Sequence, residues 1–171
     1  MKINLGCGDH YAPGWVNVDA ISNDAVNPDV VADITEKLPF QDIEHIYAGH
    51  VLEHIPHDRV SDVLRRWKES CTAGAELAIV GPDCDRGEVM VAAGQMHPLE
   101  YELLLHGGER WPGDAHLWRC TEAETMRLAI EAGWLCRAVP VASLFGTIYP
   151  LVSGVTWQFA MMCQKGTDEE V

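Results

Sequence analysis

Short apolar runs, each closed by a glycine or an acidic residue, follow one another through the first half of the chain. Runs of this kind, bounded by turn-forming residues, are typical of buried β-strands. They predict strands at Ile3–Leu5, Trp15–Asp19, Val30–Asp33, Ile43–Ala48 and Glu76–Val80. The stretch Ile34–Asp42, which contains Pro39, is expected to be only a turn.

A helical pattern follows the fourth predicted strand. Apolar residues recur there at the i, i+3, i+4 and i+7 spacing of one buried stripe, at Val60, Val63, Leu64 and Trp67. Gly74 lies just beyond and is expected to end this helix. Thr121–Glu124 has the pattern of a capping box and predicts the start of a later helix, which Gly133 would close.

Strands that alternate with helices predict an α/β fold with a largely parallel sheet. The length of 171 residues suits a single domain, 1–171. Trp134–Val141 and Trp157–Cys163 are expected to form a C-terminal hairpin. Residues 84–119 are rich in glycine, histidine and tryptophan and are expected to form an irregular insertion over one face. The polar tail 166–171 is expected to be flexible.

The charge of the chain limits its partners. The formal net charge is −14, from 26 acidic and 12 basic residues. Such a surface repels phosphate backbones, so no nucleic acid is expected as substrate or partner. No apolar run approaches the roughly 20 residues that span a bilayer, and the N-terminus has no hydrophobic signal region. A cytoplasmic protein without a membrane partner is therefore expected.

The cysteines and the polar strand ends bear on chemistry. The six cysteines form no C-x-x-C pair, which favours reduced, mostly buried thiols over a zinc knuckle or a disulfide framework.

Gly6-Cys7-Gly8 follows the first strand, Asp19 ends the second and Asp33 ends the third. Ligands of open α/β sheets bind outside the carboxyl ends of the strands, where glycines allow close approach and a carboxylate can bind ribose hydroxyls. The order of glycine loop, acid and acid therefore predicts a nucleoside-binding site.

The same residues carry a resemblance to a known family. The segments INLGCGDHYAPGWVNVD (3–19), DITEKLPF (33–40) and AGHVLEHI (48–55) resemble the class I S-adenosylmethionine-dependent methyltransferases. The likeness is greatest to a compact branch related to the type 11 group. It continues through Ala73-Gly74, Gly81-Pro82-Asp83 and Glu131-Ala132-Gly133-Trp134. It covers most of the chain except roughly 84–115.

The resemblance implies a Rossmann-like fold and a cofactor site. The sheet would have seven strands in the order 3-2-1-4-5-7-6, the last antiparallel, with helices on both faces. The cofactor would be S-adenosyl-L-methionine. Its binding residues would be Leu5, Gly6, Cys7, Gly8, Asp19, Ala20, Asp33, Ile34 and His50.

The chain departs from the family pattern in two places. Only eight residues separate Gly6 from Trp15, whereas a parallel crossover normally needs a dozen or more. The helix that usually follows the glycine loop is therefore expected to be stunted or absent. The chain also starts directly at the first strand, without the N-terminal helices that often cover such sites, so the insertion at 84–119 is a candidate lid.

Methyl transfer from a sulfonium needs mainly positioning, and a base only when the acceptor is protonated. The candidate catalytic residues are His54, Asp83 and His116. His54 follows His50 by one helical turn, although it could instead cap or pack the following helix. The eight histidines contain no H-E-x-x-H or comparable pattern, and the resemblance implies no metal, so no metal is expected.

The sequence thus predicts methyl transfer to an oxygen, nitrogen or carbon atom of a small-molecule acceptor. The alternative is a cofactor-binding or assembly module with reduced turnover, which the short crossover and missing cover favour. A nicotinamide-binding oxidoreductase is rejected, because Tyr11 stands where its G-x-G-x-x-G motif needs the third glycine, and because the acid comes too early. An oligomeric partner is not indicated.

Overall fold

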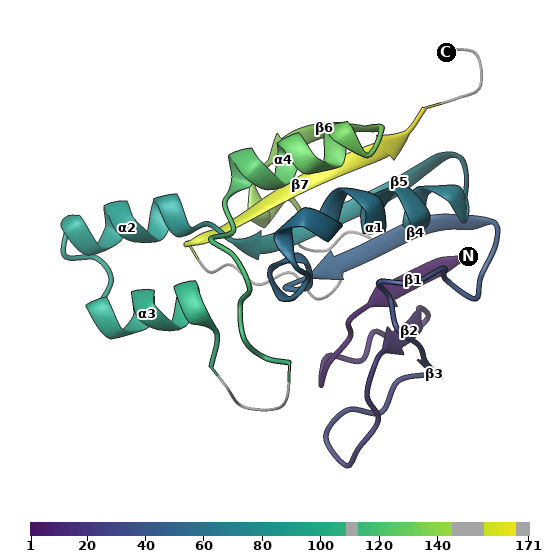
Figure 1. The fold of residues 1–171 in the computed structure, drawn as a ribbon, viewed down its shortest axis with the longest axis horizontal. Coiled ribbons are helices and arrows are strands. Elements are labelled where there is room, and N and C mark those ends of the chain that lie inside the picture. Colours follow the sequence, from purple (N-terminus) through teal and green to yellow (C-terminus); the bar gives the residue numbers. More distant parts are fainter. Residues whose placement is uncertain (109–112, 145–155, 167–171) are drawn as a thin grey trace.

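Within residues 1–108, 113–144 and 156–166, which the computed structural model describes, seven strands form one sheet in the order β3-β2-β1-β4-β5-β7-β6 (Figure 1). The strands are β1 (Lys2–Leu5), β2 (Val16–Asp19), β3 (Val30–Val31), β4 (Ile43–Gly49), β5 (Cys71–Pro82), β6 (Trp134–Val139) and β7 (Gln158–Lys165). The neighbouring pairs among β1–β5 are parallel, whereas β7 is antiparallel to β5 and to β6. The predicted strand order and the C-terminal hairpin are therefore confirmed.

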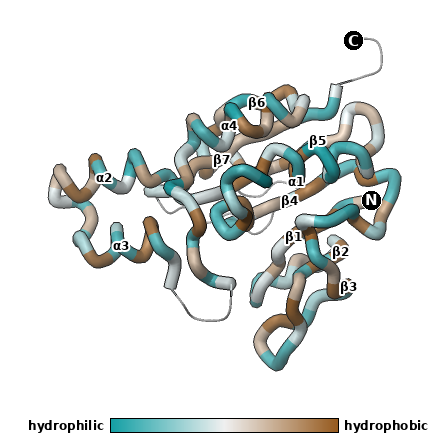
Figure 2. The backbone as a smooth tube through the Cα atoms, in the orientation of Figure 1, coloured by the Kyte–Doolittle hydropathy of each residue, from teal (hydrophilic) through white to brown (hydrophobic). Residues whose placement is uncertain are grey.

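The helices of the described residues lie on the sheet and beyond one end of it. They are the 3-10 helix η1 (Leu52–His54), α1 (His57–Glu69), α2 (Cys84–Ala92), α3 (Pro98–His106), α4 (Glu122–Glu131) and the 3-10 helix η2 (Val141–Leu144). Helices α1 and α4 pack side by side on one face, and α2 and α3 extend past the end where β5 stops (Figure 1). Hydrophobic residues lie along β4, which runs behind α1 in Figure 2.

Helix α1 buries the stripe that its apolar spacing predicts. The four stripe residues are fully buried against the sheet and α4: Val60, Val63, Leu64 and Trp67. The indole of Trp67 donates a hydrogen bond to the carbonyl of Ile34 (2.7 Å), and the indole of Trp134 donates one to the carbonyl of Leu64 (3.0 Å). Since a buried indole N–H needs a partner, these bonds fix both the position and the rotation of α1 on the sheet.

The opposite face of β1 and β2 is covered by a loop. Residues 7–15 contain no helix, as the short crossover predicts. Asn4 and Asn17 are buried beneath this loop, and the Asn4 side-chain amide donates to Asn17 Oδ1 (2.9 Å). Asn17 also accepts from the Ala12 amide (2.7 Å) and donates to the Ala12 and Trp15 carbonyls (both 3.1 Å). These side chains thus provide the loop with the hydrogen bonds that a helix would make internally.

Strands β4 and β5 separate the two layers of the core by simple alternation. Ile46 and Ala48 face α1, whereas Tyr47 between them faces the other side. Tyr47 packs there with Ala12 and Trp15 of the loop and with Leu144 of η2. The core therefore has one hydrophobic layer on each face of the central strands.

Two expectations about the helices are wrong. Helix α1 ends at Glu69, and Gly74 lies within β5 with a positive φ of 74°. The register between β4 and β5 shifts between Ile43 and His45. Gly74 therefore lies in a β-bulge and does not end a helix. The insertion predicted at 84–119 contains α2 and α3. The apolar pattern of these helices is weak, because few of their residues are buried.

The cysteines differ in part from the expectation. Cys136 and Cys163 face each other across the β6–β7 pair and form a disulfide, which corrects the prediction of reduced thiols. The other four are free and buried, as predicted.

Thr121 caps α4 by accepting from the Glu124 amide (3.2 Å), which confirms the start of that helix. No helix in the described part of the chain is long and apolar enough to cross a membrane. The predicted flexible tail from 167 onward lies outside the described residues.

We predict that Asn17→Ala lowers the free energy of unfolding by about 2–4 kcal/mol, because it leaves several buried polar groups without partners. Urea denaturation followed by circular dichroism measures the change. Asn27→Ala is the matched control: this exposed asparagine should change stability by less than about 0.5 kcal/mol. Equal effects of the two substitutions would contradict the role given to Asn17.

Candidate functional site

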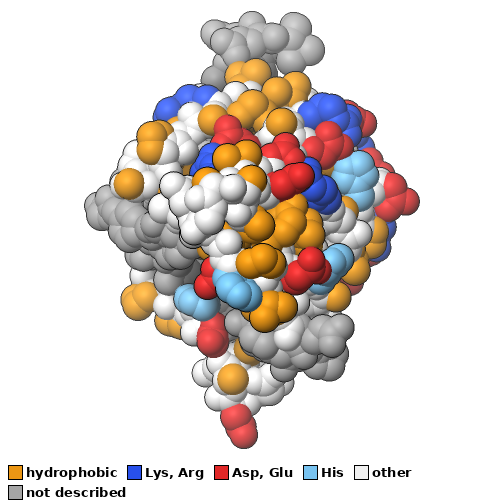
Figure 3. Space-filling model, turned by 90° about the vertical axis from the view of Figure 1, so that its left-hand side faces the viewer, with side chains coloured by type: hydrophobic (Ala, Val, Ile, Leu, Met, Phe, Trp, Pro, Cys, Tyr) orange, Lys and Arg blue, Asp and Glu red, His pale blue; other side chains and the backbone are white. Residues whose placement is uncertain are grey.

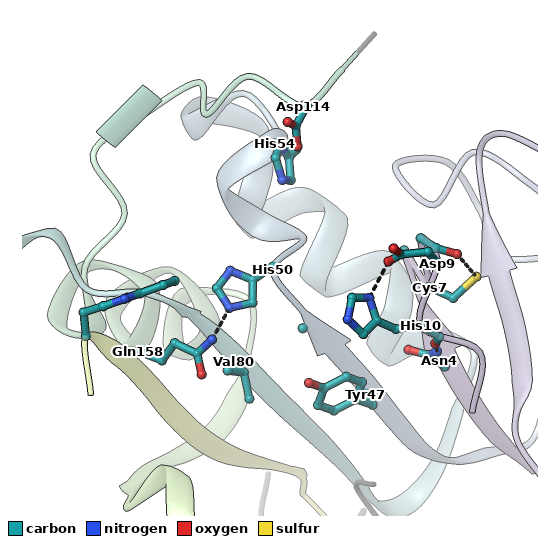
Figure 4. A pocket seen from close by; sticks show the side chains of 14 residues that line it. Asn4, Cys7, Asp9, His10, Tyr47, His50, His54, Val80, Asp114 and Gln158 are labelled. Carbon is teal, nitrogen blue, oxygen red and sulfur yellow. Dashed lines mark hydrogen bonds and ion pairs between the residues drawn. The ribbon is translucent and has the colours of Figure 1, made fainter. Parts of the chain in front are cut away.

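A cavity of about 360 Å³ opens at the carboxyl ends of β1 and β4, and we call it the glycine-loop cavity (Figure 4). It is lined on one side by Gly6, Cys7 and Gly8, which follow β1, and on the other by Gly49 and His50, which end β4. Because the carboxyl ends of parallel strands meet at one edge of the sheet, both segments reach the same space. Four predicted cofactor residues therefore lie together: Gly6, Cys7, Gly8 and His50.

The glycine loop needs its glycines for two different reasons. Gly6 has a φ of 63°, and a Cβ atom there would lie 2.6 Å from Cγ2 of buried Val51. Gly8 has a φ of 52°, but a Cβ atom there would meet no heavy atom within 4 Å. The first glycine thus lets the loop pack on the core, whereas the second leaves open space inside the cavity.

Neither acidic strand end lines the cavity, although Asp19 is bonded to the glycine loop. Asp19 Oδ2 accepts a hydrogen bond from the amide of Gly8 (2.8 Å), and its Oδ1 accepts one from the amide of Ile21 (3.2 Å). Asp33 is exposed and accepts from the hydroxyl and the amide of Thr35, which lowers the pKa of the Asp33 carboxyl. The side chain of Leu5 is buried in the core.

Of the predicted cofactor residues, five do not line this cavity: Leu5, Asp19, Ala20, Asp33 and Ile34. Their binding roles stay predictions.

His50 is held on both ring nitrogens. It adopts a positive φ of 56°, and its amide donates to the Val80 carbonyl (2.8 Å). The side-chain amide nitrogen of Gln158 lies 2.7 Å from His50 Nε2 (Figure 4). An amide nitrogen can only donate, so Nε2 accepts, and Nδ1–H donates to Glu53 Oε1 at 3.0 Å. The ring therefore has a defined tautomer and orientation.

Glu53 is the charged residue that the sequence analysis missed. Its side chain is 1% exposed. Burial acts to raise the pKa of its carboxyl, but the hydrogen bond from His50, and the positive charge that His50 and His54 carry when they are protonated, act to lower it, and the net effect is a lowered pKa. Glu53 is therefore a buried carboxylate. The spacing His50-x-x-Glu53 was the available signal, since it is one helical turn.

His54, which lines the glycine-loop cavity, lies against His116, which does not. Their rings lie at 72° with centroids 5.0 Å apart. Nδ1 of His54 bonds to the carbonyl of Ala115 (3.1 Å), and Nδ1 of His116 bonds to the carbonyl of Leu104 (2.8 Å). Burial lowers the pKa of His116, which favours the neutral ring. The structure thus brings together two of the three predicted catalytic residues, although their catalytic roles stay predictions.

Asp83, the third predicted catalytic residue, lies elsewhere, as do two further histidines, His57 and His97. The carboxylate of Asp83 caps α2 by accepting from the Arg86 amide, forms an ion pair with the Arg86 guanidinium (3.4 Å), and lines neither cavity described here. His57 faces Glu124 (2.7 Å) and Trp118. His97 caps α3.

A second cavity, of about 600 Å³, lies between the histidines and α3, and we call it the α3 cavity. Leu103 and Leu104 give it an apolar wall, and Glu53 and His116 a polar one. Figure 3 views this end of the molecule and shows apolar side chains among acidic groups and histidines. Both cavities are lined by His50, His54, Asp114 and Trp157, so they adjoin at these residues. Sequence reasoning missed Asp114, Trp157 and Gln158, which come from segments far along the chain.

Solved structures share this architecture. A SAM-dependent methyltransferase from Methanosarcina mazei matches with a TM-score of 0.61 and 16% identity, over 98% of this chain and 92% of that one. Human N-acetylserotonin methyltransferase in complex with SAM matches with 0.58 and 13%, over 97% and 47%. A proposed O-methyltransferase from Nostoc punctiforme matches with 0.61 and 12%, over 96% and 51%.

The chain has the class I methyltransferase fold. At these identities the similarity concerns the fold, and the chain spans about half the length of the human and Nostoc proteins. Neither a protein-family model nor a curated protein sequence matches the chain. In this fold, the glycine-loop cavity occupies the ligand-binding edge of the sheet, at the carboxyl ends of the parallel strands.

We predict that Gly6→Ala destabilises the methyltransferase fold more than Gly8→Ala does, by roughly 2 kcal/mol. Both substitutions force alanine into a positive φ, which costs about 1–2 kcal/mol, but only the methyl group at residue 6 collides with Val51. Urea denaturation of the two variants under identical conditions gives the difference. If Gly8→Ala were the less stable variant, the packing role given to Gly6 would be wrong.

Proposed function

We propose that this protein is an S-adenosylmethionine-dependent methyltransferase that acts on a small-molecule acceptor. The observation that carries the proposal is the pair of adjoining cavities, which meet at His50, His54, Asp114 and Trp157. One cavity lies on the glycine loop, and the other is walled by leucines and polar groups. Two such spaces with a common boundary suit a reaction that transfers a small group between two bound molecules.

The residues of the glycine loop fit the cofactor. Gly8 presents a cavity surface with no side chain, and Gly6 and Cys7 bring backbone groups to the same space. Gly6, Cys7 and Gly8 would hold the methionine end, His50 would lie beside it, and Asp19 would bind the ribose next to Gly8. Neighbouring structures of the same fold contain this cofactor or its demethylated product, which supports the assignment.

The residues around the α3 cavity would place the acceptor. The bound cofactor would supply a methyl group already activated on a sulfonium, so the main requirement is an in-line approach of the acceptor atom. If the acceptor is a hydroxyl, an O–C bond forms as the S–C bond breaks, and the hydroxyl proton must leave. His54 and His116 each bond through Nδ1–H to a carbonyl, so each can accept that proton at Nε2.

We predict that S-adenosylhomocysteine binds the purified protein and that Gly8→Ala weakens this binding at least about tenfold, because the added methyl group occupies cavity space. Isothermal titration calorimetry measures both affinities. Gly74→Ala is the matched control, since it has a positive φ and an open Cβ position but lies in the β5 bulge away from the cavity. No detectable binding to the wild type at millimolar ligand would overturn the proposed cofactor site.

Methyl release then separates the proposal from its alternative. With a mixture of cell metabolites as acceptor, the wild type should form S-adenosylhomocysteine above the rate without acceptor, and Gly8→Ala should form less. Cofactor binding without such turnover would instead support a binding or assembly module. The small-molecule acceptor, the absence of nucleic-acid and membrane partners, and the cytoplasmic location stay predictions.

A further inference from the structure

Three side chains with metal-ligating atoms converge on the wall of the α3 cavity. Glu53 and His54 are consecutive in η1, and His116 lies in the segment that leads to α4. One potential ligand atom from each of the three lies within 4.8 Å of the other two. All three residues line the α3 cavity, so a bound ion would be reached from that space.

The hydrogen bonds of the two imidazoles prepare them for metal binding. The backbone carbonyls of Ala115 and Leu104 can only accept, so the Nδ1 atoms of His54 and His116 carry the protons. Each neutral ring then has its lone pair on Nε2. A histidine that ligates a metal typically donates its other ring N–H to a carbonyl or a carboxylate in this way, which fixes its tautomer and orientation.

The charge of Glu53 adds an independent argument. A buried carboxylate is costly unless a cation or several hydrogen-bond donors compensate it. In the described part of the chain, the ion-pair partner found for Glu53 is His50. The bond from Gln158 to His50 Nε2 makes that ring a neutral donor. The negative charge of Glu53 therefore has a hydrogen bond but no full counter-charge in this contact.

We infer that Glu53, His54 and His116 form a binding site for a divalent transition-metal ion such as Zn²⁺. Two imidazoles and one carboxylate are a ligand set of catalytic zinc and non-haem iron sites, which keep further coordination positions open. Mg²⁺ and Ca²⁺ prefer oxygen ligands alone, so they fit this set poorly. In a tetrahedral site the ligand atoms stand roughly 3.4 Å apart, a spacing compatible with three atoms that lie within 4.8 Å of one another.

The site gives the α3 cavity a specific chemistry. Open coordination positions would face the space where the acceptor is proposed to bind, and a metal-bound hydroxyl loses its proton more readily than a free one. His54 and His116 would then act as ligands and not as bases. This consequence rests on the proposed function, whereas the metal site itself does not.

The test is calorimetric titration of the metal-stripped protein with ZnCl₂ at neutral pH. We expect one site of micromolar affinity or tighter in the wild type, and at least about tenfold weaker binding in His54→Ala and in His116→Ala. His57→Ala is the matched control, because this histidine is three residues from His54 but pairs with Glu124; its affinity should equal that of the wild type. Excess Mg²⁺ should not compete.

Two results would overturn the inference. One is wild-type binding weaker than about 100 μM; the other is equal Zn²⁺ affinity in the wild type and both ligand variants, which would place the ion elsewhere, for example on cysteines. Circular dichroism of each variant checks that it is folded. S-adenosylhomocysteine is titrated into the same samples. Zn²⁺ binding without S-adenosylhomocysteine binding would overturn the proposed function but support the metal site. S-adenosylhomocysteine binding without Zn²⁺ binding would overturn the metal site but support the proposed function.

Discussion

The hydrogen bond between the buried side chains of Asn4 and Asn17 is the interaction on which the ligand-binding edge depends. It joins β1 to β2 on the face that has no crossover helix, and through Ala12 and Trp15 it holds the covering loop. Without these bonds, the loop would have to leave buried polar groups unsatisfied or admit water. The loop that follows Gly6 and contains Gly8 thus depends on two buried asparagines as well as on its glycines.

Apolar periodicity was sufficient for the central sheet and for α1. The strands are short but strongly hydrophobic, and the stripe from Val60 to Trp67 has one clear helical period. The same reasoning failed for α2 and α3, because these helices pack mainly on each other at the end of the sheet. Gly87 permits that contact, since a Cβ atom there would lie 3.0 Å from the Tyr101 ring. A glycine inside a helix gives no periodic signal.

The candidate site was predictable where it follows the chain locally and not where it depends on distant segments. The Gly6–Gly8 loop and His50 directly follow β1 and β4, which are parallel neighbours in the sheet, so both lie at the same edge. Gln158, by contrast, is 108 positions from His50 in the sequence, and no local pattern predicts that contact. Asp83 had the right position at a strand end, but a helix begins directly after it and uses its carboxylate as a cap.

The antiparallel direction of β7 has a consequence for how the protein is made. A parallel strand in that place would begin at the opposite edge, but β7 begins at the edge where the other central strands end. Its first residue, Gln158, and the preceding Trp157 therefore reach the site. During synthesis, His50 therefore has no contact with Gln158 until the ribosome has added 108 further residues. A nascent chain that has folded only its first five strands would have the glycine loop, but its cavity would lack the wall formed by Trp157 and Gln158.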